Sequence, residues 1–383
     1  MTDTYPPLLQ TILAEIAARD FRRGDLESVR VRWNEYLARV GETIPGVEIE
    51  SGGESVHLGR LSPGCQACKD GTWDCVFITM RCNLECPFCY SPEARLADFS
   101  GSVFGKTPEE IAEKYVQSGI RGVGLSGGEP FLRMEELINW LKRLRQLYPQ
   151  AYYWVYTNGL LVDEATLSRL GELGLDEIRF NLAATGYNNP TVMQNVAAAV
   201  RRLPRVTVEI PSIPEHAHKI LACLARWADL GVRTLNLHEL IYEPGTRSQS
   251  MAGERLEFIA PDGHVAMFNP ESRELTLAVL ARVAEQGLPL AVNDCSMQSK
   301  MRQLRGRRRN IYRVLRPETE KLVDDREYET ICAFTAQDGL FIHPDDYPQA
   351  HSHLPGYRFA RLRRLAPLAL QAQPQWISCE ILI

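Results

Sequence analysis

The stretch Cys75–Tyr90, CVFITMRCNLECPFCY, decides how the rest of this chain is interpreted. Its first part, from Val76 to Thr79, is an apolar and β-branched run that is typical of a buried strand. The strand leads into a loop that holds Cys82, Cys86 and Cys89 with the spacing C-x3-C-x2-C. Three thiols so close together on one loop predict a metal centre.

Two kinds of metal centre use clustered cysteines. Three thiolates at this spacing can hold three irons of a cubane [4Fe–4S] cluster, which usually takes four cysteine ligands. Here the fourth iron has no nearby thiol and is left open to another ligand. A structural zinc ion normally closes its tetrahedron with a fourth Cys or His, and no His lies in the loop or just after it. The loop therefore favours an iron–sulfur cluster over zinc.

The loop resembles the signature C-x3-C-x-Φ-C of the radical S-adenosylmethionine (radical SAM) enzymes, with Phe88 as the aromatic Φ. The sequence GGEP, Gly127–Pro130, at the next predicted strand end strengthens this resemblance, which covers roughly residues 72–240. It implies a SAM molecule that chelates the open iron through its amino and carboxylate groups. An electron from the cluster then cleaves SAM to methionine and a 5′-deoxyadenosyl radical, which removes a hydrogen atom from a substrate. It also implies an oxygen-sensitive protein and a reductant such as flavodoxin or ferredoxin.

Composition places the chain among soluble globular proteins. Its 383 residues suit one large domain with appendages, or two domains, and 45% of them are hydrophobic and 24% charged. No apolar run is long enough to span a bilayer and the N-terminus lacks the regions of a signal peptide, so we expect a cytoplasmic protein with no membrane partner. Ten cysteines in such a protein indicate metal or redox chemistry rather than disulfides. The net charge of −5 argues against a nucleic-acid partner.

Strands and helices alternate after the cysteine loop. A capping box at Thr107–Glu110 starts a helix that runs to about Ser118. The later predicted strands are Gly122–Ser126, Tyr152–Tyr156, Glu177–Leu182, Val206–Ile210 and Thr234–Leu237, and the helices between them are Met134–Leu147, Glu164–Leu173, Val192–Arg202 and Ala217–Leu230. These strands start about every 25–30 residues, the size of right-handed βαβ units. Six repeats fall short of a closed eight-stranded barrel, and the resemblance implies an α/β partial (β/α)6 TIM-like barrel.

Two further parts are expected around this barrel. Apolar residues at helical spacing over residues 5–42 predict a helical N-terminal extension, and the Gly- and Pro-rich stretch Gly41–Gly64 reads as a linker or irregular loop. Past Pro244 the barrel pattern stops, and short strands and a helix over Leu275–Gln286 suggest a small α+β C-terminal domain for substrate or accessory roles. The expected boundaries are 1–64 for the extension and linker, 65–243 for the barrel and 244–383 for the C-terminal region.

In parallel β/α barrels the chemistry gathers at the carboxyl ends of the strands. Gly127, Gly128 and Glu129 lie at such an end, and the resemblance implies that this GGE motif binds the methionine amino group, mainly through backbone carbonyls. The alternative for these residues is a plain strand-to-helix turn. Phe88 would lie against the adenine, although an aromatic residue there is equally typical of the core.

The other strand ends supply further candidates for SAM contacts. These are Thr157 and Asn158, Asn181, Glu209 and His238, after or near the ends of the third, fourth, fifth and sixth strands. The resemblance implies that Asn181 contacts the ribose or carboxylate and that His238 contacts the ribose. The alternatives are an Asn-Gly turn at Asn158, a solvent- or partner-facing charge at Glu209 and a satisfied structural residue at His238. No residue stands out as catalytic in its own right.

A second cysteine pair, Cys65 and Cys68, precedes the signature strand. A C-x2-C loop aims two sulfurs at one point and chelates well, but one pair is half a site. Completed by Cys75, Cys295, Cys332 or Cys379, it would hold an auxiliary iron–sulfur cluster or a structural metal; otherwise the two thiols bind no metal. Within the superfamily, this upstream pair resembles a group similar to the activating enzyme of pyruvate formate-lyase.

The sequence does not fix the substrate. The leading hypothesis is a small-molecule transformation of undetermined class (oxidoreductase, lyase or transferase). The alternative is modification of a protein or peptide, including glycyl-radical activation, with the N-terminal extension or the arginine-rich run Lys300–Arg316 as a dock. Such a run is otherwise a solvated helix face. Nucleic-acid modification and a non-catalytic zinc-binding module are the remaining readings, and the GGEP sequence and missing fourth ligand count against the zinc module.

Overall fold

The computed structural model describes residues 37, 40–42, 44–50, 53–89, 107–242, 246–253, 255–259, 265–315, 319–323, 327–336, 339–365 and 375–382. Most of the expected N-terminal helices lie outside these residues. The chain divides into two compact units. The larger unit spans residues 25–258 and 266–303, and the smaller unit takes residues 1–24, 259–265 and 304–383.

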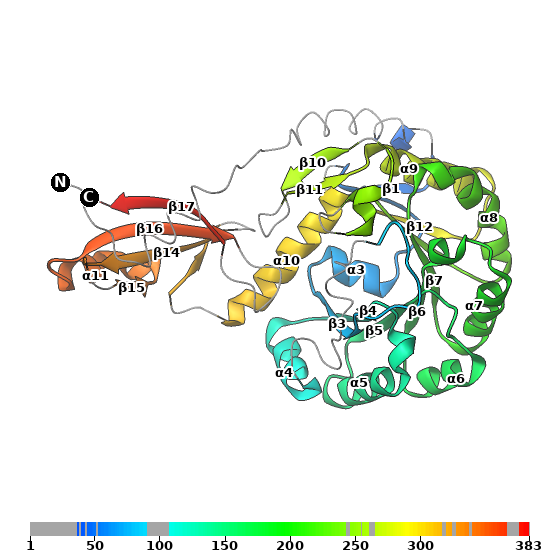
Figure 1. Cartoon of the computed structure of the whole chain (residues 1–383), viewed down its shortest axis with the longest axis horizontal. Helices are drawn as coiled ribbons and strands as arrows, with labels where there is room; N and C mark the ends of the chain where they lie inside the picture. The colour runs from blue at the N-terminus through cyan, green and yellow to red at the C-terminus, as the bar shows by residue number, and fades with distance from the viewer. Residues whose placement is uncertain are drawn as a thin grey trace. The chain divides into compact units, whose positions relative to one another are not determined.

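A curved nine-stranded sheet forms the centre of the larger unit (Figure 1), in the order β1-β2-β12-β8-β7-β6-β5-β4-β3. The strands are β1 Val47–Glu50, β2 Ser55–Leu58, β3 Trp73–Thr79, β4 Gly122–Gly127, β5 Tyr152–Thr157, β6 Glu177–Phe180, β7 Val206–Pro211, β8 Thr234–His238 and β12 Ala291–Cys295. From β12 to β3 all neighbours run parallel, while β1 and β2 form an antiparallel hairpin on β12. This is the expected partial barrel, with a seventh parallel strand.

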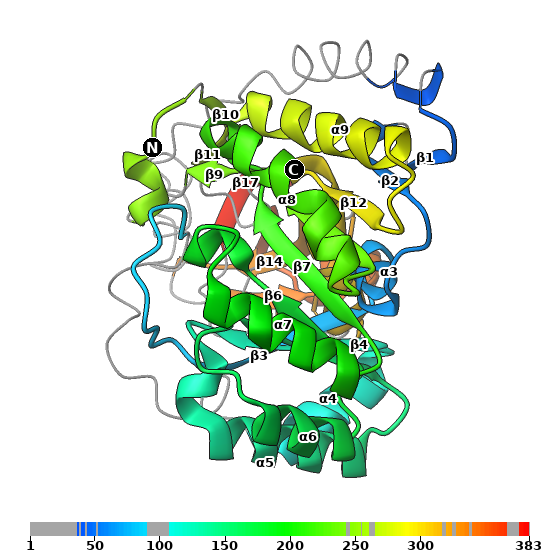
Figure 2. The same cartoon turned by 90° about the vertical axis from the view of Figure 1, so that its right-hand side faces the viewer.

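Helices cover the outside of the curved sheet (Figure 1), and α7 and α8 lie across β6 and β7 in Figure 2. The helices are α4 Pro108–Ser118, α5 Met134–Leu147, α6 Glu164–Glu172, α7 Pro190–Arg202, α8 Ala217–Asp229 and α9 Pro270–Glu285. Every second strand residue faces them and is fully buried, as Val76, Ile78, Val123 and Leu125 show. This core between sheet and helices holds the strand ends in fixed positions. No helix in the described part of the chain has the length and hydrophobicity that a bilayer crossing requires.

A short helix, α3 Pro63–Lys69, lies inside the curve of the sheet (Figure 1). Two glycines make room for it: a Cβ on Gly64 would lie 2.4 Å from Nη2 of Arg179, and one on Gly122 would lie 2.7 Å from Cβ of Ala67. The Cys65–Cys68 pair is therefore on a helix and not on the expected loop. Ser62 caps the helix by accepting from the backbone N–H of Cys65, and a proline follows at the first helical position.

The expectation of a linker over Gly41–Gly64 is wrong. This stretch contains β1 and β2, and β2 pairs with β12 through Leu58–Val292 and His57–Asn293. The strands were not predicted because glycine and glutamate are poor strand formers. In addition, β12, with which β2 pairs, lies more than 230 residues further along the chain. The sheet therefore continues across both expected boundaries of the barrel, since β12 also lies beyond residue 243.

The remaining elements follow the sixth barrel strand. They are β9 Ile241–Tyr242, β10 Leu256–Ile259 and β11 Val265–Phe268 in a small sheet, helix α10 Met297–Leu315, and β13 Lys321–Leu322, β14 Glu327–Phe334, β15 Gly339–Ile342, α11 Tyr347–His353, β16 Arg358–Leu365 and β17 Gln375–Leu382. In the smaller unit, β13 to β17 form one antiparallel sheet. Apolar clusters lie on both faces of that sheet, one around Cys332 and Phe334 and one around Phe359 and Tyr347 of α11. The smaller unit thus combines an antiparallel sheet with helix α11, whereas α9, which was expected in the C-terminal domain, belongs to the larger unit.

Candidate functional site at the carboxyl ends of the strands

The three signature cysteines follow the carboxyl end of β3 on one loop. Cys82 is exposed, whereas Cys86 and Cys89 are partly buried. The backbone N–H of Cys89 donates to the carbonyl of Cys86 at 3.1 Å, which closes the loop into a turn. The segment after β9 packs against it, because Ser248 donates its backbone N–H to the carbonyl of Cys89 at 3.3 Å.

The thiols of this loop lie close enough to influence one another electrostatically. Burial and then the neighbouring Cys82 and Cys89 raise the pKa of Cys86 to about 11. Burial also raises the pKa of Cys82, with Glu129 and Cys89 adding to the effect. Metal ligation requires thiolates, and the raised pKa values of Cys82 and Cys86 show that neighbouring thiolate charges on this loop oppose one another. Cationic irons would relieve that repulsion, and the donor set fits a cluster held by three cysteines.

The GGE segment is clamped directly onto the cysteine loop. The backbone N–H of Gly128 donates to the carbonyl of Thr79 at 2.7 Å, and that of Glu129 donates to the carbonyl of Arg81 at 2.8 Å. A Cβ on Gly127 would lie 1.9 Å from the Thr79 oxygen, and one on Gly128 would lie 2.2 Å from the Arg81 oxygen. Gly127 also has φ +129°, in a region that favours glycine. Both glycines are therefore required for the cysteine loop to approach β4.

The Glu129 side chain is fully buried and serves as an acceptor inside the protein. It accepts from Oγ1 of Thr157 at 2.9 Å, from the backbone N–H of Asn158 at 2.7 Å and from that of Phe131 at 3.2 Å. Burial nevertheless raises the pKa of Glu129. The carboxylate therefore joins the ends of β4 and β5.

Asn158 in turn faces the cysteine loop. Its Nδ2 donates to Oδ1 of Asn83 at 2.7 Å and lies 4.0 Å from Sγ of Cys82. The Thr157 hydroxyl accepts from the backbone N–H of Gly159 in addition to its bond to Glu129. The side chains of Thr157 and Asn158 are thus engaged by protein groups around the three-cysteine loop.

Glu209 pairs with His238 and also with the buried Arg179. Oε1 of Glu209 lies 2.6 Å from Nε2 of His238, and Oε2 of Glu209 pairs with Arg179 at 2.9 Å. Burial alone raises the pKa of Glu209, but Arg179 and His238 outweigh it and hold this pKa well below its usual value. Glu209 is 8% exposed, and its carboxylate faces Arg179 and His238 rather than solvent. Burial and Lys300 lower the pKa of His238 against the opposing effect of Glu209.

Asn181, Phe88 and Phe77 are the remaining residues near the cysteine loop and the strand ends. Oδ1 of Asn181 accepts from the backbone N–H of Ala184 at 3.3 Å, and its amide begins the turn after β6. Phe88 is buried at 8% exposure. Phe77 is 39% exposed although its neighbours Val76 and Ile78 are fully buried, so it points away from the helices into the curve of the sheet. That interior surface is therefore accessible at the level of the cysteine loop.

In the described part of the chain, no three His, Cys, Asp or Glu side chains converge as ligands of a single metal ion. The thiolates of a cubane bind three different irons, so they need not converge on one point as the ligands of a single ion do. The missing single-ion site therefore counts against zinc and not against a cluster. Cys65 and Cys68 likewise belong to no such group of three among the described residues. Burial raises the pKa of Cys68, Arg179 opposes this rise, and Cys65, Cys295 and Cys75 add to it.

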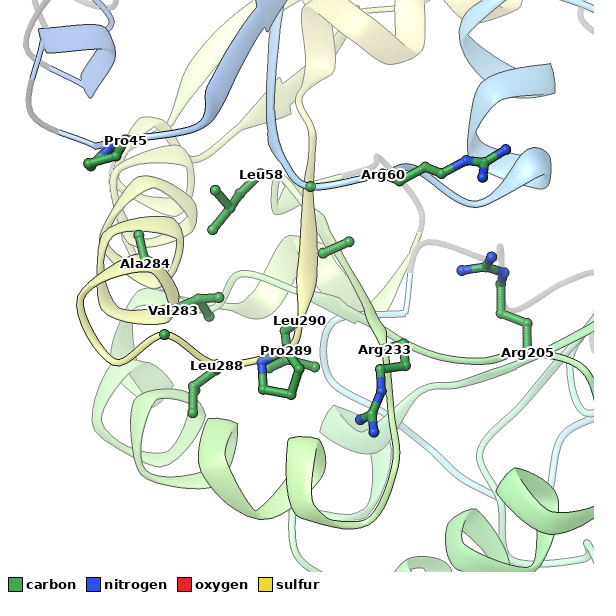
Figure 3. A pocket seen from close by; sticks show the side chains of 13 residues that line it. Pro45, Leu58, Arg60, Arg205, Arg233, Val283, Ala284, Leu288, Pro289 and Leu290 are labelled. Carbon is green, nitrogen blue, oxygen red and sulfur yellow. The ribbon is translucent and has the colours of Figure 1, made fainter.

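A separate hollow of about 560 Å³ lies at the opposite end of the strands (Figure 3). It is lined by Ala291 at the start of β12 and by Arg205 and Arg233, which precede β7 and β8. Both arginines already donate to protein oxygens, Arg205 to Thr234 and Arg233 to Ala228 and Val232. The hollow is remote from the three-cysteine loop, and none of the predicted site residues lines it.

Sequence reasoning missed three contacts of the cysteine loop. Asn83 receives the Asn158 amide, Ser248 bonds the Cys89 carbonyl, and Arg247 pairs with Glu85 at 3.1 Å. The position of Asn83 between two signature cysteines was a usable signal. Arg247 and Ser248 gave no sequence signal, because they lie in an irregular segment that only the fold brings to the cysteine loop.

Comparison with known proteins places the barrel in a class. Residues 76–234 match the model of the radical SAM superfamily. This region of the chain therefore belongs to that superfamily, as the cysteine signature and the GGEP sequence predicted. Its curated relatives are enzymes of several reaction classes.

Among the relatives is a candidate glycyl-radical enzyme activating enzyme of Methanocaldococcus jannaschii, 30% identical over 48% of this chain and 51% of that protein. The PqqA peptide cyclase of Granulibacter bethesdensis is 32% identical over 32% of each chain, and the GTP 3′,8-cyclase of Aquifex aeolicus is 36% identical over 27% of this chain and 32% of that protein. The chain thus spans about half or less of these relatives. The solved structure of Streptococcus suis SuiB bound to S-adenosylmethionine is 13% identical, with a TM-score of 0.42 over 58% of this chain and 49% of that one.

Proposed function

We propose that this protein is a [4Fe–4S]-dependent radical SAM enzyme that abstracts a hydrogen atom from its substrate. One observation carries the proposal: the three-cysteine loop after β3 is clamped onto the GGE segment after β4 by two backbone hydrogen bonds at 2.7 and 2.8 Å. A cluster on Cys82, Cys86 and Cys89 would therefore lie beside the backbone of Gly127, Gly128 and Glu129. The chemistry supplied on binding is one-electron reductive cleavage of SAM to methionine and a 5′-deoxyadenosyl radical.

The residues at the neighbouring strand ends would hold the cofactor. Nε2 of His238 is committed to the Glu209 carboxylate at 2.6 Å, and burial lowers the pKa of this imidazole. Nδ1 is then the ring nitrogen left for a ribose hydroxyl. The amide of Asn181 is suited to the ribose or the carboxylate. Thr157, Asn158 and Glu209 would act behind these contacts by fixing Glu129, Cys82 and His238.

The barrel interior would direct the radical to one C–H bond. Phe77 supplies an accessible apolar surface at the level of the cysteine loop, while α3 and the Arg179 ion network fill the interior further down. Excluding water and spare side chains from a reactive radical is the main task of such a cavity. Phe88 would lie near the adenine in the same region.

The substrate class stays a proposal with two forms. A small molecule is the first form, because the relatives include a GTP cyclase. A peptide or protein substrate, including one activated to a glycyl radical, is the alternative, because other relatives are a peptide cyclase and a candidate activating enzyme. A flavodoxin or ferredoxin would supply the electron in either case.

The test is release of 5′-deoxyadenosine from SAM. Anaerobically reconstituted protein, reduced with dithionite, should form 5′-deoxyadenosine and methionine, and Cys86→Ser should abolish both. Cys223→Ser is the matched control, since Cys223 lies on α8 away from the loop. Equal product from the parent and the Cys86 variant would refute the assignment.

A further inference from the structure

Asn158 is held in a single orientation at the edge of the cysteine loop. The residue is 6% exposed, and its Oδ1 accepts from the backbone N–H of Leu160 at 3.1 Å. A backbone N–H can only donate, so it fixes which end of the amide is the oxygen. The NH₂ group must therefore face the other way, toward Asn83 and Cys82.

The two hydrogens of that NH₂ group have two destinations. One is directed to Oδ1 of Asn83, 2.7 Å from Nδ2. The other faces Sγ of Cys82, 4.0 Å from Nδ2 and at the outer limit of an N–H···S contact. A thiolate is a stronger acceptor than a thiol, so ligation of Cys82 to iron would strengthen this contact.

The backbone behind Asn158 is equally fixed. Its own N–H donates at 2.7 Å to Oε2 of Glu129, which is fully buried. Glu129 is tied through its backbone to Arg81, the residue before Cys82, at 2.8 Å. These two hydrogen bonds and the peptide bond from Arg81 to Cys82 thus fix the distance between the Asn158 amide and the Cys82 sulfur.

We propose that Asn158 is a positioning residue that donates an N–H to the Cys82 thiolate and thereby raises the reduction potential of the cluster. The inference rests on the proposed function, because it assumes a cluster on Cys82. Hydrogen bonds to cluster sulfurs are among the factors that set the potential. Reduction adds negative charge to the sulfurs, so a donor stabilises the reduced form more than the oxidised form.

Two variants separate this donor from the turn that Asn158 forms. In Asn158→Ser, the hydroxyl can still accept from Leu160 in the same kind of turn, but it is too short to reach Cys82. In Asn158→Asp, the turn bond is kept and an acceptor replaces the donor. The matched control is Asn195→Ala. Its amide donates to the carbonyl of Gly159, the residue after Asn158, at 2.8 Å but does not face the Cys82 sulfur.

The measurement is an EPR-monitored redox titration of each reconstituted protein, with iron content and melting temperature determined on the same samples. We expect a more negative potential for Asn158→Ser, a larger shift in the same direction for Asn158→Asp, and the parent value for Asn195→Ala. Parent potentials in both Asn158 variants at full iron content would overturn the inference. Loss of iron from both at unchanged melting temperature would also overturn it, since a tuning contact is not needed for assembly. Absence of a cluster in the parent would instead refute the proposed function.

Discussion

At the scale of single residues, Gly128 is required by space rather than by backbone conformation. A Cβ at this position would lie 2.2 Å from the carbonyl oxygen of Arg81, which is backbone and cannot simply rotate away. The cysteine loop would have to move off β4. The two backbone hydrogen bonds that clamp it would then be lost.

Gly128→Ala should therefore lower the free energy of unfolding by about 1–3 kcal/mol and release iron from the reconstituted protein. Gly287→Ala is the control, because it has φ +58° but no atom within 4 Å of the added Cβ. It should cost about 1 kcal/mol through backbone strain alone and keep its iron. Thermal unfolding and iron analysis test this, and full iron content in Gly128→Ala would contradict it.

Glu239 gives a pH dependence that can be predicted with its sign. It is 2% exposed, its Oε2 accepts from the backbone N–H of Met297 at 2.7 Å, and its Oε1 has no hydrogen-bond partner among the residues that the structure describes. Burial raises the pKa of Glu239 to about 8 despite the opposing effect of Arg273. Between about pH 4.5 and 8 the folded state therefore holds a proton that the unfolded state has lost.

Stability should fall as pH rises through that window, by up to about 1.4 kcal/mol per pH unit for this one group. Glu239→Gln keeps the acceptor for Met297 and removes the titration. Its stability should exceed that of the parent at pH 8 and converge with it toward pH 5. Urea unfolding at several pH values measures this, and parallel curves for the two proteins would rule out the raised pKa.

At the scale of elements, helix α3 depends on glycine at position 64. Alanine is the better helix former by up to about 1 kcal/mol, yet the added Cβ would meet Nη2 of Arg179 at 2.4 Å and Trp154 at 3.1 Å. Arg179 cannot move freely, because it pairs with Glu177 at 3.0 Å and with Glu209 at 2.9 Å. Steric repulsion should therefore outweigh helix propensity.

We expect Gly64→Ala to destabilise the protein by about 1–3 kcal/mol. Gln66→Ala, in the same helix, should change stability by less than about 0.5 kcal/mol, because it removes one exposed bond to Asp70. Chemical denaturation of the two variants decides the matter. A stabilised Gly64→Ala would show that α3 does not pack inside the sheet as described.

Elements with local signals were predictable from sequence, and those that depend on distant pairing were not. The capping box at Thr107 and Glu110 is present, and α5 spans Met134–Leu147 as predicted. The β1–β2 hairpin was missed because its place in the sheet is set by β12. The cofactor roles expected at the strand ends stay predictions. The position of Asn83 between two signature cysteines marks it as a site residue, but its bond to Asn158 joins residues 75 apart and depends on the fold.

At the scale of the whole molecule, the number of irons bound per chain shows how many of the ten cysteines ligate clusters. One cluster on Cys82, Cys86 and Cys89 requires about four irons and four sulfides per chain. An auxiliary cluster involving Cys65 and Cys68 would raise both values to about eight. The Cys65–Cys68 pair lies on helix α3 and is half a site, so we expect about four, measured on anaerobically reconstituted protein, with Cys65→Ser unchanged. Eight irons, falling to four in Cys65→Ser, would establish the second cluster.

The central claim is that three cysteines hold a cluster whose remaining iron is open to SAM. Mössbauer spectroscopy of ⁵⁷Fe-reconstituted protein, recorded with and without SAM, tests it most directly. We predict that one iron in four changes its spectrum when SAM is added, while the other three do not. Four irons unaffected by SAM, or zinc in place of iron on this loop, would contradict the account.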